Sequence, residues 1–256
     1  MPDALSILLR GLSFIALFQS IGAALFVDLF GRPLTVSLPP IRRVARVSAA
    51  AALVLLLGQY LLEAARMADA MTGMFDASLQ RLVFESPSSL VLLVAVSFAL
   101  LGHTAASPWR MALAALLTGH VLLVAFWFGA LAPLYLIVGA EPRPAAAALI
   151  VSFTRGATWL VPVILVAGIS MALALINPAA DLLTGYGLSL IAKLMGFTIL
   201  MAFAAVNKWR LAPAIATGDP QVRRAFRRSL ACEYALICVV LGITAAMTTL
   251  YSPESD

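Results

Sequence analysis

The chain has 256 residues, of which 62% are hydrophobic and only 11% are charged. A soluble globular domain carries about twice that charged fraction, so the composition excludes an ordinary soluble domain. The formal net charge of +5 could indicate a nucleic-acid partner, but most basic residues lie in two short segments, 31–46 and 207–228. Such clusters are typical of cytoplasmic loops of membrane proteins. The sequence therefore predicts an integral membrane protein that binds no nucleic acid.

Long apolar runs predict the membrane-spanning helices. A span needs roughly 20 apolar residues, so the chain has room for about seven or eight. The runs cover residues 4–30, 44–66, 88–106, 111–138, 146–176, 186–206 and 229–251. Residues 67–87 are mixed and polar, and Pro39-Pro40 is expected in the loop before the second run. We expect an all-α, polytopic transmembrane helix bundle that forms a single integral-membrane domain over residues 1–256.

The positions of the basic residues predict the orientation. Segment 207–228 holds six basic residues and one acid, so it is expected in the cytoplasm, with the C-terminus outside. Counting back through seven spans places the loop 31–43 outside as well. That loop contains Arg32, Arg42 and Arg43, which the same rule places inside. One more crossing or a re-entrant segment between residues 67 and 106 would remove the conflict.

Only two histidines occur in the chain, His103 and His120, and both lie in apolar surroundings. His103 ends the third apolar run, and His120 lies inside the fourth. An ionisable side chain at membrane depth is costly, so each is a candidate functional residue. The alternative is that each imidazole only forms a hydrogen bond to a neighbouring helix.

Several short motifs of the second half occur in a fixed order. They are Gly102-His103-Thr104-Ala105-Ala106, His120 followed by Ala125-Phe126-Trp127-Phe128-Gly129-Ala130-Leu131, Phe153-Thr154-Arg155, Gly185-Tyr186-Gly187 with Lys193, Asn207-Lys208-Trp209-Arg210-Leu211-Ala212-Pro213, and Arg227-Arg228-Ser229 with Glu233. This ordered set resembles the copper resistance protein D family (CopD, also PcoD), best over residues 100–253. Ala130 departs from the pattern, because the family usually has a second glycine there.

The resemblance implies a multi-pass protein of the bacterial inner membrane that handles copper. The family is usually drawn with eight spans and both termini outside, which favours an outside N-terminus and places residues 67–87 outside. A periplasmic copper-binding donor protein is implied as a partner, beside the copper ion and the lipid bilayer. The periplasmic C-terminus agrees with the charge pattern.

Copper needs soft or borderline ligands, and imidazole and thioether both qualify. His103 and His120 are therefore the first candidate ligands. Met67, Met71 and Met74 are spaced i, i+4 and i+7, so on one helix they would share a face suited to Cu(I). Methionine is also a common filler of irregular cores, which is the alternative for these three.

Other polar residues near the apolar runs have simpler interpretations. Arg155, Asn207 and Glu233 lie near helix ends, where long side chains reach the membrane interface. Lys193 lies further inside its run, and the sequence names no partner for it. Glu63 could attract a cation near Met67, although an ordinary interfacial carboxylate is the simpler interpretation.

Three functions follow from these patterns. The first is a permease that moves copper from the periplasm inward by exchange between a few weak ligand sites. The second is a b-type haem protein with His103 and His120 as axial ligands. The third is a membrane protein of copper homeostasis or assembly that transports nothing. The sequence contains no phosphate loop, nucleophile elbow or zinc motif, so we expect no enzymatic activity.

Overall fold

The protein was analysed as a computed structural model that describes residues 2–68, 70–85, 110–175 and 184–250. These residues form helices and connecting turns, with no strand among them, which confirms the predicted all-α bundle. In this part of the chain, six helical segments are long and apolar enough to cross a membrane. They are α1 (Pro2–Phe30), α2 (Leu38–Met67), α6 (Arg110–Ala140), α7 (Arg143–Leu175), α8 (Gly185–Val206) and α10 (Pro220–Leu250).

Shorter helices lie at both ends of this bundle. The 3-10 helix η1 (Met71–Phe75) and α3 (Ala77–Glu85) follow α2. A π-helical segment η2 (Asn207–Leu211), α9 (Ala212–Ala214) and η3 (Ile215–Thr217) extend α8 towards α10. The predicted run 88–106, including His103, lies outside the described residues.

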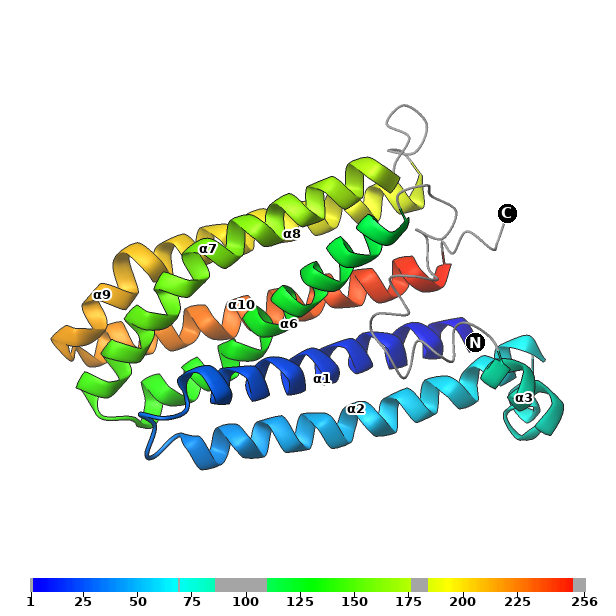
Figure 1. Ribbon diagram of the computed structural model, residues 1–256, viewed down its shortest axis with the longest axis horizontal. Helices are drawn as coiled ribbons and strands as arrows, with labels where there is room; N and C mark the ends of the chain where they lie inside the picture. Colours follow the sequence, from blue (N-terminus) through cyan, green and yellow to red (C-terminus); the bar gives the residue numbers. More distant parts are fainter. Residues whose placement is uncertain (1, 69, 86–109, 176–183, 251–256) are drawn as a thin grey trace.

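The centre of the bundle is α6. Helices α1, α7 and α10 pack against it, while α2 packs on the far side of α1 and α8 packs on α10 (Figure 1). The largest buried side chains of this core include Phe26 of α1 and Phe128 of α6. Phe153 of α7 contacts Phe26 with 6.1 Å between the ring centroids, and Tyr234 of α10 stacks on Phe128 at 4.6 Å. Aromatic contacts therefore join α7 to α1 and α10 to α6.

Two glycines allow α1 and α6 to touch through their backbones. A Cβ atom on Gly129 would lie 2.4 Å from Gly22 Cα, and one on Gly22 would lie 2.0 Å from Ala125 O. Small residues permit this approach between membrane helices. Beside the contact, buried Gln19 donates from Nε2 to Gly129 O at 3.1 Å. Gly129 therefore has a packing role.

The start of α2 differs from the prediction. Pro39 and Pro40, expected in a loop, lie in the first turn of the helix, which begins at Leu38. Proline is tolerated there because first-turn N–H groups have no partner within the helix. The loop between α1 and α2 is therefore shorter than expected, covering residues 31–37.

Both basic segments lie at one end of the bundle, called here the basic end and made of segments 31–46, 138–143 and 207–228 (Figure 1). Counting back through seven spans placed loop 31–43 at the end opposite to segment 207–228, and this expectation is wrong. The end of α1 and the start of α10 lie at the basic end (Figure 1). The opposite end holds the start of α1, the end of α2, the start of α6 and the end of α10 (Figure 1). The start of α1 and the end of α10 thus lie at the same end of the bundle, which agrees with a family drawn with both termini on one side.

The connection at the basic end depends on Glu141, a buried residue between α6 and α7. Its Oε1 accepts hydrogen bonds from the backbone N–H groups of Thr35, Val36 and Ser37, at 3.2, 2.9 and 2.7 Å. Burial alone would raise the pKa of Glu141, but these donors outweigh it and hold the pKa below its ordinary value. The carboxylate thus fixes the backbone of the loop that leads into α2.

Candidate metal site in the membrane

His120 lies in α6 and faces α7. Its half-buried imidazole has Nδ1 3.1 Å from the carbonyl oxygen of Ile164. A carbonyl oxygen can only accept, so Nδ1 must carry the hydrogen of this bond. In the neutral ring the lone pair then lies on Nε2, where a metal ion can bind. Metal-ligating histidines very commonly donate their other ring nitrogen to a carbonyl or carboxylate in this way.

A glycine on α7 makes room for the ring. A Cβ atom at Gly168 would lie 3.3 Å from Cε1 of His120. Gly168 follows Ile164 by four residues, so the two lie on the same face of α7, one turn apart. The histidine is therefore positioned by one hydrogen bond and by one missing side chain, both from α7.

Lys193 is a second ionisable side chain inside an apolar run, for which the sequence names no partner. It lies in α8 and is half-buried. Its only sequence signal was a lysine inside an apolar helix, which is rare and marks functional sites in membranes. The imidazole of His120 is positioned between α6 and α7, within the membrane-length segments.

The three methionines do not share one helix, contrary to the spacing argument. Helix α2 ends at Met67, and Met71 begins the separate 3-10 helix η1, of which Met74 is also part. The chain turns back at this point, because a Cβ atom on Gly73 would lie 2.8 Å from Ala64 O of α2. Spacing alone does not reveal where a helix ends, so the shared face was wrong. Met67 and Met71 are nevertheless exposed, at the end of the bundle opposite to the basic end.

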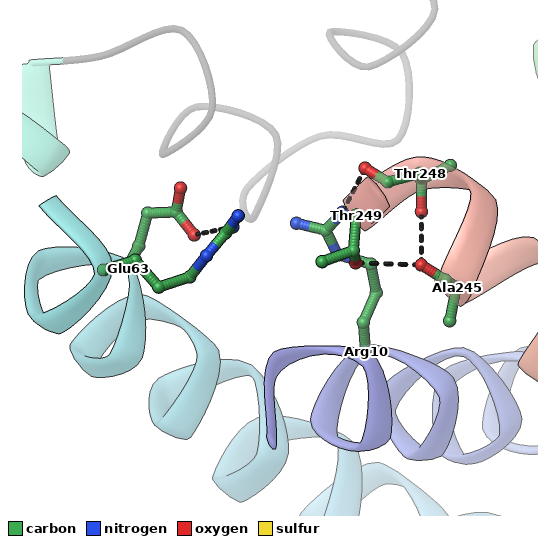
Figure 2. Close-up of polar contacts among 6 residues, drawn as sticks. Arg10, Glu63, Ala245, Thr248 and Thr249 are labelled. Atoms are coloured by element: carbon green, nitrogen blue, oxygen red, sulfur yellow. Dashed lines mark hydrogen bonds and ion pairs between the residues drawn. The ribbon is translucent and has the colours of Figure 1, made fainter. Parts of the chain in front are cut away.

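Charged residues near these methionines are already engaged. Figure 2 shows Arg10 of α1, whose Nη1 donates to Thr248 O in the last turn of α10 at 2.7 Å. It also shows Glu63, whose Oε2 lies 3.3 Å from Nη1 of Arg66. Arg10 therefore joins α1 to α10, and Glu63 is an interfacial carboxylate with a nearby cation. Among the described residues, no group of three or more His, Cys, Asp or Glu side chains gathers to hold a metal.

A second buried polar pair lies towards the basic end. Nδ2 of Asn207 donates to Oε1 of Glu233, which is only 2% exposed. The expectation that these two residues reach the membrane interface is therefore wrong. Asn207 begins η2, and its side chain fixes this π-helical segment to α10. Lys193 lies more than three helical turns before Asn207, so Glu233 belongs to a different level of the bundle.

Comparison with known proteins supports the family resemblance. Residues 147–247 match the family model of copper resistance protein D. This match confirms the resemblance over residues 147–247, and the six membrane-length helices agree with a multi-pass membrane protein. It includes Ile164, Gly168 and Lys193, whereas His120 and the three methionines lie before it. Neither the comparison with curated proteins nor that with solved structures gives a match.

Proposed function

We propose that the protein is a copper permease in which His120 is a ligand within the membrane. The observation that carries the proposal is the hydrogen bond between Nδ1 of His120 and the Ile164 carbonyl, because it leaves Nε2 available to copper. The family match supports copper as the metal, and the six membrane-length helices support a location in the membrane. His103, the proposed partner or first station, lies outside the described residues.

Lys193 gives this ligand a property that transport needs. We further propose that Lys193 of α8 lies near enough to His120 for its positive charge to weaken the binding of a cation there. A transport site must bind tightly enough to admit the ion and loosely enough to release it. In the proposed path, thioethers of Met67, Met71 and Met74 capture Cu(I) at the outer end. His120 then receives the ion by ligand exchange on its way to the basic end, which is cytoplasmic in this proposal.

The test is copper accumulation in cells that express His120→Ala at wild-type level. We expect accumulation to fall to the level of cells without the protein. Gly168→Ala keeps the imidazole and crowds it, so it should also reduce accumulation. Gly156→Ala is the matched control on α7, because a Cβ atom there meets nothing within 4 Å. Wild-type accumulation in well-expressed His120→Ala cells would overturn the proposal.

A visible spectrum of the purified protein separates the two metals that imidazole could serve. A colourless protein that retains copper supports the permease. A Soret band that disappears in His120→Ala, with copper accumulation unchanged, would instead assign His120 to haem b. Lys193→Met tests the weak-binding argument in the same preparation, since removal of the charge should make Cu(I) binding tighter.

A further inference from the structure

A hollow of about 290 Å³ lies at the basic end, between the turn after α6 and the start of α10. Four arginines line it, Arg143, Arg223, Arg224 and Arg227, together with Gly139 and Gly218. Among the described residues, no carboxylate forms an ion pair with any of the four. The nearest acids in sequence are engaged elsewhere: Glu141 accepts from loop 31–37, and Asp219 accepts from the backbone N–H of Gln221.

Two of these arginines are held in place by the protein. Arg223 donates from Nε and Nη2 to Val138 O, at 3.0 and 2.5 Å, and from Nη2 to Gly139 O at 3.1 Å. The guanidinium of Arg227 lies over the Tyr135 ring, with Cζ 4.1 Å from the centroid, and its buried Nε has no hydrogen-bond partner. Fixed guanidinium groups bind an anion at a smaller entropic cost than mobile ones.

The two glycines are needed for the shape of this hollow. A Cβ atom on Gly218 would lie 2.4 Å from Nη1 of Arg143, and Gly218 adopts a positive φ of 77° that suits glycine. A Cβ atom on Gly139 would lie 3.3 Å from Cζ of Arg227. Helices α7 and α10 both begin beside the hollow, so the positive ends of two helix dipoles add to the four charges.

We propose that this hollow binds the phosphodiester headgroup of an anionic phospholipid. Arginine forks match phosphate oxygens, and basic pockets between membrane helices recognise anionic headgroups. The position at the ends of membrane-length helices favours a lipid over a soluble phosphate, because headgroups lie at that depth. The bound headgroup would hold the start of α10 against the turn between α6 and α7. This site is independent of the copper path.

The direct test uses the full-length wild-type protein in nanodiscs and needs no variant. Hydrogen–deuterium exchange is compared between phosphatidylcholine alone and phosphatidylcholine with phosphatidylglycerol. We expect phosphatidylglycerol to protect peptides from 138–143 and 218–227, and to leave 38–46 of α2 unchanged. Equal protection of 38–46 would indicate a general charge effect and overturn the proposal, as would no protection of the hollow.

Lipid titration followed by native mass spectrometry then tests the arginines. Arg143→Gln with Arg224→Gln removes the two lining arginines that neither donate to the end of α6 nor stack on Tyr135, and should weaken phosphatidylglycerol binding roughly tenfold. Arg43→Gln with Arg228→Gln removes two exposed charges from the same end and should change it little. Equal loss in both double variants would contradict a built site. Displacement of the lipid by sub-millimolar inorganic phosphate would assign the hollow to a soluble anion instead.

Discussion

The two ends of the bundle use charge differently. At the basic end, Glu141 and Arg223 bind backbone groups of other segments, so charged side chains hold the turns together. At the opposite end, Arg10 makes one such contact, Glu63 has only a partly exposed partner one helical turn away, and Met67 and Met71 are exposed. The basic end therefore has most of the charged side chains, which hold its turns together and indicate the orientation. The candidate copper-binding methionines lie at the opposite end.

Orientation is the first test of this contrast, with an all-or-none outcome. The basic end should face the cytoplasm because it holds both basic clusters. A reporter that is active only outside the cytoplasm should therefore be active when fused after Asp256, and inactive when inserted after Gly218. The reverse result would place Met67 and Met71 in the cytoplasm and remove the proposed capture step.

Glu141→Gln should produce the largest loss of stability. The amide keeps the size of the side chain but loses the charge that accepts three backbone N–H groups, at a cost of about 2–3 kcal/mol. Glu63→Gln is the matched control at the opposite end, where a partly exposed pair is worth at most about 1 kcal/mol. Unfolding in mixed detergent measures both. Equal losses would show that the ends are not different.

The same carboxylate predicts a pH dependence. The pKa of Glu141 in the folded protein lies below its ordinary value of 4.5, so the carboxylate stabilises the fold above that value. This contribution should disappear as the pH falls below 4.5 and passes through the folded pKa. Glu141→Gln should lack this component of the pH profile, and an unchanged profile in that variant would contradict the assignment.

Much of the fold, but less of the site, could be predicted from the sequence. Hydropathy located α1 and α6 because membrane helices must be long and apolar. It misplaced the starts of α2 and α10, which were expected at residues 44 and 229 but lie at Leu38 and Pro220, because prolines that end one helix can also begin another. The Glu141 contact joins residues more than 100 positions apart, and no local pattern indicates such a pair.

In the site, the sequence identified residues of a rare type but could not show which helix faces they occupy. His120 was identified because an imidazole in an apolar helix is unusual. Lys193 was noticed for the same reason, yet whether it faces His120 depends on how α8 is rotated in the bundle. The roles of Ile164 and Gly168 could not be predicted from the sequence. Ile164 acts through its backbone carbonyl oxygen, and Gly168 acts because it has no side chain to crowd the imidazole.

Arg10→Gln should have a smaller effect on stability than Glu141→Gln. It removes the bond from Arg10 to Thr248 O, which joins the first and last membrane-length helices at the end opposite to the basic end (Figure 2). We expect a loss of about 1–2 kcal/mol, because the donor is charged and half-buried. Arg46→Gln is the control: that exposed side chain reaches only Arg42 O of its own helix. An equal loss of stability in Arg46→Gln and Arg10→Gln would contradict a stabilising role for the bond between Arg10 and Thr248 O.

The smallest expected effect concerns the three methionines together. Leucine keeps their volume and apolarity but cannot bind copper, so a packing role would survive the exchange Met67→Leu, Met71→Leu and Met74→Leu. Because η1 is separate from α2, these thioethers form at most a loose capture site ahead of His120. Loss of one weak site in series should lower uptake roughly threefold at limiting copper and leave it unchanged when copper saturates the path. Met195→Leu, at an exposed position of α8, is the control for methionine loss as such.

Thioethers do not titrate, so the difference between the triple variant and wild type should stay constant with pH, whereas imidazole ligands compete with protons. Wild-type uptake by the triple variant at limiting copper would show that the exposed methionines are filler and that capture takes place elsewhere.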